Sequence, residues 1–228
     1  MVDLTSSTQI DLADLVNSNA AINGDVIAAE FQSAGRGRLD RTFEATPGSA
    51  LLFSFFIKPK RVRSDWGFIA HLAALSMREV ISQDIPSQVQ LKWPNDILIG
   101  DKKVAGILSQ ATDDGVIIGI GVNVAMTAEE LPVETATSIG LMGSSKLDRN
   151  LLLANFLNLF EVNFEKWDEG VDFIDRYSAV CATLGRQVQI EVIGRANRTG
   201  KALTINKVGA LMLDDGFEVN VGDVVHLR

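Results

Sequence analysis

The chain has 228 residues, of which 46% are hydrophobic and 22% charged, a balance typical of a folded globular protein rather than a disordered or fibrous one. Its net charge is −8, which disfavours nucleic acid or an acidic membrane as a partner unless a local basic patch is present. The single cysteine, Cys181, has no partner for an intramolecular disulfide, and no segment resembles a signal peptide or a membrane span. We therefore expect a cytoplasmic protein with neither DNA nor a membrane as its partner.

Hydrophobic periodicity predicts a mixed α+β fold. The first helix should follow a capping box at Thr8–Asp11, and Asp148 should cap a long helix near the middle of the chain. The expected helices cover 10–16, 66–82, 150–167 and 173–182. The expected strands cover 25–31, 50–57, 89–92, 97–99, 104–109 and 116–124. The strand at 50–57 is apolar enough to be buried on both faces.

The pattern changes after Leu184, where short apolar stretches alternate with glycines. This spacing is typical of a small all-β barrel. We therefore divide the chain into a larger α+β domain at 1–183 and a C-terminal β-barrel at 184–228, with an interface between them.

Motifs of several common catalytic classes are incomplete. The dinucleotide fingerprint that begins at Gly35 lacks its third glycine, and the phosphate-loop spacing from Gly194 is one residue too long. His71, His226 and Cys181 belong to no recognisable triad or metal cluster. An enzyme with this sequence would work without a covalent enzyme intermediate.

Glycines and cations on non-helical segments are the remaining candidates. Three arginines lie within seven residues in Gly35–Arg41, where guanidinium groups and backbone N–H groups can converge on one anion. Lys92 ends a strand and is followed by Trp93-Pro94-Asn95-Asp96, while Lys103 enters a strand that contains Gly106. Each segment alone also fits an ordinary charged surface, but together they indicate a site for a phosphate or carboxylate.

These segments, with two others, resemble the biotin protein ligase family. The resemblance is carried by Ser7-Thr8, Glu30-Phe31-Gln32, Gly35-Arg36-Gly37-Arg38, Lys92-Trp93-Pro94-Asn95-Asp96, Lys103–Leu108 and Gly119–Asn123. It implies a mixed sheet flanked by helices, like the catalytic core of class II aminoacyl-tRNA synthetases, followed by a small C-terminal barrel. Biotin and ATP would form biotinyl-5′-adenylate and pyrophosphate, and a lysine of a biotin carboxyl carrier domain would then accept biotin.

The resemblance also assigns roles to individual residues. Lys92 and Arg38 would be catalytic, because positioned cations reduce the repulsion between a carboxylate and an α-phosphate. Biotin would be bound by Ser7, Thr8, Gln9, Gln32, Arg36, Gly37, Arg38 and Lys92. ATP would be bound by Arg38, Lys92, Lys103, Asn123 and Arg228. Magnesium is expected with ATP, although no acidic cluster in the sequence marks its ligands.

Some features depart from the family pattern. Gln9 replaces a common asparagine, Asp40 a common glycine, and Phe43 a common tryptophan. Because the chain begins close to Ser7, we expect a short form without an N-terminal DNA-binding domain. Three alternatives stay open: a lipoate ligase or acyltransferase of related fold, a non-catalytic biotin or nucleotide sensor, and an unrelated α+β domain. A homodimer is as compatible with the sequence as a monomer.

Overall fold

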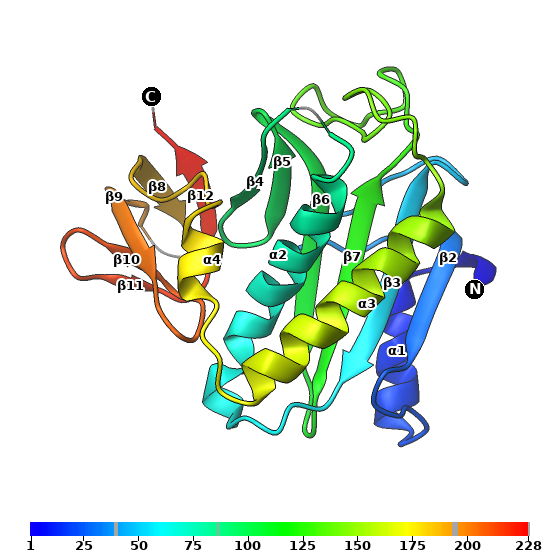
Figure 1. Ribbon diagram of the computed structural model, residues 1–228, viewed down its shortest axis with the longest axis horizontal. Helices are drawn as coiled ribbons and strands as arrows, with labels where there is room; N and C mark the ends of the chain where they lie inside the picture. The colour runs from blue at the N-terminus through cyan, green and yellow to red at the C-terminus, as the bar shows by residue number, and fades with distance from the viewer. Residues whose placement is uncertain (39–40, 86, 193–195, 228) are drawn as a thin grey trace.

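The chain folds around a large sheet beside a smaller one (Figure 1). The structure is a computed structural model and describes residues 1–38, 41–85, 87–192 and 196–227. The strands of the large sheet follow the order β1-β2-β3-β7-β6-β5-β4, and only β1 and β2 pair in parallel. Their bounds are β1 Val2–Thr5, β2 Val26–Gln32, β3 Ala50–Ile57, β4 Val89–Lys92, β5 Asp96–Ile99, β6 Lys102–Ala111 and β7 Val116–Asn123.

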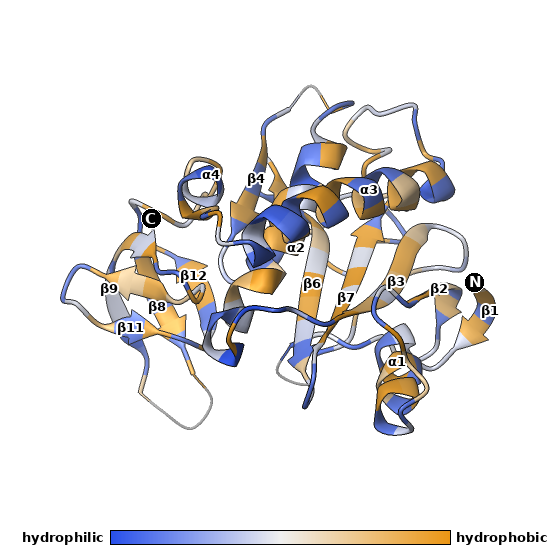
Figure 2. Cartoon of the chain, turned by 60° about the horizontal axis from the view of Figure 1, so that its bottom comes forward, coloured by the Kyte–Doolittle hydropathy of each residue, from blue (hydrophilic) through white to orange (hydrophobic). Residues whose placement is uncertain are grey.

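Helices cover both faces of this sheet. Helix α1 (Thr8–Asn17) packs on one face, while α2 (Ile69–Ile81) and α3 (Arg149–Asp168) pack on the other (Figure 2). Strand β3 is buried along its whole length because it lies between these layers. Phe53 and Phe55 contact Phe156 of α3, whereas Phe56 belongs to the small cluster beneath α1. The prediction of a strand buried on both faces is confirmed.

The predicted helices are present with shifted ends. Asp148 caps α3 by accepting the N–H groups of Asn150 and Leu151, as predicted. The helix predicted from residue 66 begins instead with a 3-10 turn at Arg63–Phe68, and the predicted fourth helix is limited to α4, Ile174–Ser178. None of the helices in the described residues is long and apolar enough to span a membrane.

The start of α1 differs from the predicted capping box. Ser7 is the N-cap residue and its side chain makes no capping hydrogen bond. The Thr8 hydroxyl instead contacts Gln32 and Ser54, on two neighbouring strands. The hydroxyl of Thr8, the first residue of this helix, therefore serves a tertiary contact rather than the helix end.

The C-terminal strands form an open sheet, so the predicted barrel is wrong. The order is β11-β10-β9-β8-β12, all antiparallel, with β11 at one edge and β12 at the other. The bounds are β8 Gln187–Glu191, β9 Arg198–Ile205, β10 Leu211–Leu213, β11 Glu218–Val219 and β12 Asp223–His226. Among the described residues β11 pairs only with β10. Because β11 has only two residues, it offers few hydrogen bonds with which to pair with β12 and close the sheet into a barrel. Buried residues of both sheets form one continuous core, and the division at 183/184 stays a prediction.

Candidate functional site

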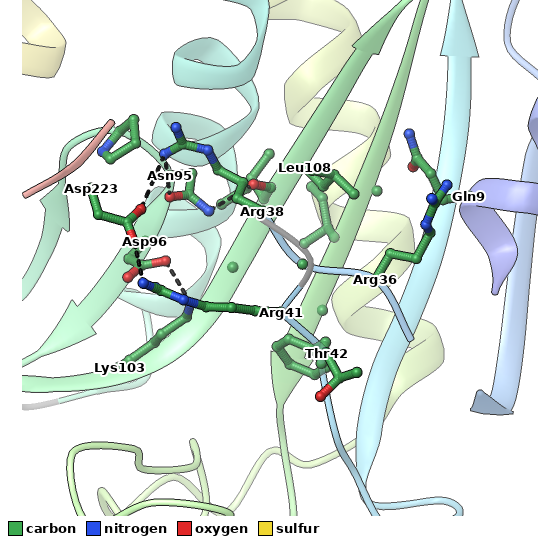
Figure 3. Close-up of a pocket in the computed structure, with 18 of the residues that line it drawn as sticks. Gln9, Arg36, Arg38, Arg41, Thr42, Asn95, Asp96, Lys103, Leu108 and Asp223 are labelled. Carbon is green, nitrogen blue, oxygen red and sulfur yellow. Dashed lines mark hydrogen bonds and ion pairs between the residues drawn. The ribbon is translucent and has the colours of Figure 1, made fainter. Parts of the chain in front are cut away.

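One pocket of about 270 Å³ lies between the two sheets. Its walls come from the start of α1, strands β3, β6 and β7, the turn after β4, and strand β12 (Figure 3). A further wall is the arginine segment, by which we mean residues 36–38 and 41–43. Residues remote in sequence therefore meet in a single cavity.

Uncharged polar side chains line one part of the pocket. Gln32 Oε1 accepts hydrogen bonds from the Thr8 backbone N–H, at 2.8 Å, and from the Thr8 hydroxyl, at 3.0 Å. Ser54 Oγ lies 2.8 Å from Thr8 Oγ1 and donates to Gln9 Oε1 at 3.2 Å. Gln9 Nε2 is buried and has no hydrogen-bond partner among the described residues. A buried donor without a partner is destabilising, so this amide is suited to an acceptor on a bound ligand.

Two glycines of β7 make room for this arrangement. A Cβ atom at Gly119 would lie 2.6 Å from Gln9 Oε1, and one at Gly121 would lie 2.7–2.9 Å from the ring of Phe43. Real side chains do not approach so closely, so any larger residue would displace Gln9 or Phe43. Gly119 thus leaves space for the polar group, and Gly121 lets the arginine segment approach the sheet.

The opposite part of the pocket is strongly charged. Arg38 donates to Asn95 Oδ1 at 3.3 Å and to the carbonyl of Gly222 at 3.2 Å, and its Nη1 lies 4.0 Å from Asp223 Oδ1. Arg41 is ion-paired with the same carboxylate (Figure 3). Burial lowers the pKa of the Arg38 guanidinium, while the charges of Asp223 and Asp96 oppose that effect.

Lys92 and Lys103 add two more cations. Lys103 Nζ lies 2.6 Å from Asp96 Oδ1, an ion pair without the alignment of a good hydrogen bond. Gly106 lies beside this pair, since a Cβ there would be 3.2 Å from Lys103 Nζ. Lys92 is half-buried at the end of β4 and has no ion-pair partner within the described parts of the chain. Its charge is therefore available to an anionic ligand.

The residue after Lys92 anchors this lysine to the small sheet. Trp93 is buried, and its backbone N–H donates to Thr183 Oγ1 at 3.0 Å while its indole N–H donates to the carbonyl of Gly209 at 2.9 Å. Thr183 Oγ1 in turn lies 3.1 Å from His226 Nε2 on β12. Burial, and then the charge of Lys92, lowers the pKa of His226 to about 4, so this imidazole is neutral at pH 7.

The comparisons with known proteins agree with this pocket. A model described as the biotin/lipoate A/B protein ligase family matches residues 1–123, more than half of the chain. The chain belongs to that family. It is 35% identical to a biotin--[acetyl-CoA-carboxylase] ligase of Mycobacterium tuberculosis, over 100% of this chain and 88% of that protein. It is 32% identical to the bifunctional ligase/repressor BirA of Bacillus subtilis, over 93% of this chain and 68% of that protein.

A solved biotin protein ligase has the same fold over nearly its whole length. The biotin protein ligase from Aquifex aeolicus in complex with biotin and ATP superposes with a TM-score of 0.83, at 28% identity, over 100% of this chain and 97% of that one. The family and enzyme class predicted from the sequence are thereby confirmed. The Mycobacterium tuberculosis and Aquifex aeolicus relatives are named as biotin ligases, which supports biotin over the lipoate, sensor and unrelated-domain alternatives.

Most of the residues predicted to bind ligand line this pocket. They are Ser7, Thr8, Gln9, Gln32, Arg36, Gly37, Arg38, Lys92 and Lys103. Asn123 does not line it, because its side chain is buried and donates to the carbonyl of Thr137 at 2.9 Å. Arg228 and the departure at Asp40 lie outside the described residues.

Several lining residues were not predicted as site residues. Asn95 and Asp96 were visible in the motif after Lys92, and Arg41 in the Gly/Arg segment. Ser54 and Asp223 carried no signal in the sequence, because each reaches the pocket only through strand packing.

Proposed function

We propose that this chain is a biotin protein ligase that activates biotin with ATP and then transfers it to a lysine of a biotin carboxyl carrier domain. The observation that carries the proposal is the union, in one pocket, of a buried polar region and a cluster of cations. Biotin has both complementary parts, a ureido ring with an acceptor oxygen and a terminal carboxylate. The names of the relatives support the same substrate.

The polar region would hold the ureido ring. Thr8, Gln9, Gln32 and Ser54 already form a connected set of hydrogen bonds, and the free amide of Gln9 supplies an additional donor. Because these groups are buried, a ligand without the matching acceptor would leave them unpaired and bind weakly. Ser7, also buried, lies beside them on the pocket wall.

The cationic region would assist the first chemical step. One oxygen of the biotin carboxylate attacks the α-phosphorus of ATP, the bond to the β,γ-phosphates breaks, and pyrophosphate leaves. Two anions must approach each other, and Lys92 and Arg38 would reduce their repulsion and stabilise the phosphoryl oxygens in the transition state. Arg36 and Gly37 would contact the carboxylate and phosphate end.

The second step is transfer to the carrier domain. A carrier lysine in its neutral amine form attacks the acyl carbon of biotinyl-5′-adenylate, AMP leaves, and an amide bond forms with loss of a proton. A biotin carboxyl carrier domain of a biotin-dependent carboxylase is the partner that the relatives' names support. A cytoplasmic location, the absence of DNA binding and a homodimer stay predictions from the sequence.

Three further residues, Lys103, Asn123 and Arg228, were predicted to contact ATP. Lys103 lines the pocket beside Gly106, and we propose that it lies near the nucleotide. Asn123 lies off the pocket, so a contact from it to ATP would need a rearrangement, and Arg228 stays a prediction. The described residues hold no group of three or more potential metal ligands, and Asp96 and Asp223 are both paired with cations. We therefore propose magnesium only as an ion that accompanies ATP, and assign it no protein ligand.

The test is transfer of labelled biotin to a purified carrier domain, with ATP and magnesium. We compare the native chain with Lys92→Ala and with Lys102→Ala, a matched variant because Lys102 is exposed and lies outside the pocket. Loss of a charge that acts in the transition state is expected to lower kcat by about 10²–10³-fold in Lys92→Ala alone. A native chain that labels nothing, or labels equally well with lipoate, would overturn the proposal.

A further inference from the structure

Two cations of the arginine segment meet a single carboxylate of the small sheet. Arg41 is ion-paired with Asp223 Oδ2, and Arg38 Nη1 lies 4.0 Å from Asp223 Oδ1 (Figure 3). Asp223 is the first residue of β12, far from the arginines in sequence. It therefore joins the catalytic pocket to the C-terminal sheet.

The residue before Asp223 strengthens this connection. The carbonyl of Gly222 accepts a hydrogen bond from Arg38 Nη2 at 3.2 Å. Gly222 has φ of +146°, and a Cβ there would lie 3.0 Å from the carbonyl oxygen of Glu191. Glycine suits this position because other residues rarely adopt such a backbone angle. Both the backbone and the side chain at the start of β12 therefore face the arginine segment.

Burial strengthens the Arg38 part of this contact relative to an ordinary surface ion pair. The side chains of Arg38 and Asp223 are only 18% and 17% exposed, whereas that of Arg41 is 67% exposed. By contrast, the Arg198–Asp215 pair of the same sheet is 44% and 43% exposed. Exposed pairs contribute little because water and salt screen them, whereas partly buried charges are screened less. The two pairs thus form a matched comparison within one sheet.

The sign of the charge at residue 223 determines which role fits it. A carboxylate repels the phosphates of ATP, so Asp223 is poorly suited to contact them. A guanidinium has five donors, and those of Arg38 that Asn95 and Gly222 leave unused remain for a ligand. Asp223 can therefore hold the arginines while they bind an anion.

We propose that Asp223 is a positioning residue that fastens the arginine segment to β12, so that biotinyl-5′-adenylate is retained until the carrier domain reacts. The proposal rests on the proposed function. Without this tether the segment would separate from the small sheet and admit water to the mixed anhydride. Water would then attack the acyl carbon, break the bond to the phosphate oxygen, and release biotin and AMP.

The first experiment measures how often the intermediate is lost. The proteins are the native chain, Asp223→Asn, Asp223→Glu and Asp215→Asn, each with biotin, ATP and magnesium, and the readout is AMP formed with and without the carrier domain. In Asp223→Asn we expect carrier-independent AMP formation to rise about tenfold, the effect of losing roughly 1.4 kcal/mol of ion-pair attraction to Arg38 and Arg41. Asp223→Glu should recover most of the retention, and Asp215→Asn should match the native chain.

A second measurement does not depend on activity. Trypsin should cleave after Arg36 or Arg41 several-fold faster in ligand-free Asp223→Asn than in the native chain or Asp215→Asn. Equal cleavage rates, or an unchanged ratio of AMP to biotin transferred, would overturn the proposal. A lower KM for ATP with normal retention would also overturn it, since Asp223 would then compete with phosphate. A native chain that makes no adenylate but shows the cleavage difference would overturn the proposed function and not the tether.

Discussion

Replacing Thr183 with valine should test how firmly the contacts between Trp93 and the small sheet hold Lys92, the proposed catalytic lysine. Thr183 is fully buried, accepts the backbone N–H of Trp93 at 3.0 Å, and lies 3.1 Å from His226 Nε2. Valine has nearly the same shape, so the main loss is the hydroxyl. Trp93 follows Lys92 directly, and the change therefore acts on the backbone that orients Lys92.

The expected magnitude follows from those two contacts. A buried N–H left without a partner costs about 1–3 kcal/mol, and loss of the second hydrogen bond adds about 1 kcal/mol. The sum is about 2–4 kcal/mol, which for a chain of this size lowers Tm by roughly 4–16 °C. Biotin transfer should also fall through kcat, because Lys92 is displaced while the uncharged polar end of the pocket is unchanged.

The assay is urea unfolding followed by circular dichroism, together with transfer kinetics. Thr183→Ser keeps the hydroxyl and should retain most of the stability and kcat, and Thr199→Val provides a control at an exposed strand position. A Thr183→Val variant within about 0.5 kcal/mol of the native chain, the usual range of a neutral surface change, would refute this reasoning.

Two more predictions concern other buried contacts. Burial lowers the pKa of His71 to about 4, so as the pH falls below 6.5 the unfolded chain binds the proton first. The contribution of neutral His71 to the free energy of unfolding is complete above pH 6.5 and is lost between pH 6.5 and about 4, a change of roughly 3 kcal/mol. The free energy of unfolding of His71→Asn, measured across that range, should not show this loss. A pH profile identical to that of the native chain would contradict the prediction. Gly121→Ala would place a methyl group 2.7–2.9 Å from the ring of Phe43 and would therefore displace the arginine segment. We expect the KM for ATP to rise about tenfold, which corresponds to a loss of roughly 1.4 kcal/mol of binding free energy. Gly140→Ala, which meets only atoms 3.4–3.6 Å away, should bind normally, and equal KM values in both variants would argue against this role of Gly121.

Local patterns identified most of the secondary structure and failed where tertiary contacts intervened. The apolar run at Ala50–Ile57 and the alternating strands of the meander are strong signals because burial leaves few other residue choices. Strand β1, Val2–Thr5, was missed because it is four residues long and largely exposed. The capping box at Thr8 was mistaken because the hydroxyl finds partners on β2 and β3 instead.

The sequence by itself indicated an anion site, because binding an anion requires particular side chains and those lie in contiguous motifs, and the resemblance of these motifs to a known family gave the ligase class. Arg38 and Lys92 could be named for that reason. Only the tertiary structure decided which residues surround them: Asp223 reaches the arginines from another sheet, while Asn123 turns to the carbonyl of Thr137. The physical reason is that strand pairing and sheet packing set these contacts across long separations in the chain, where no local spacing records them.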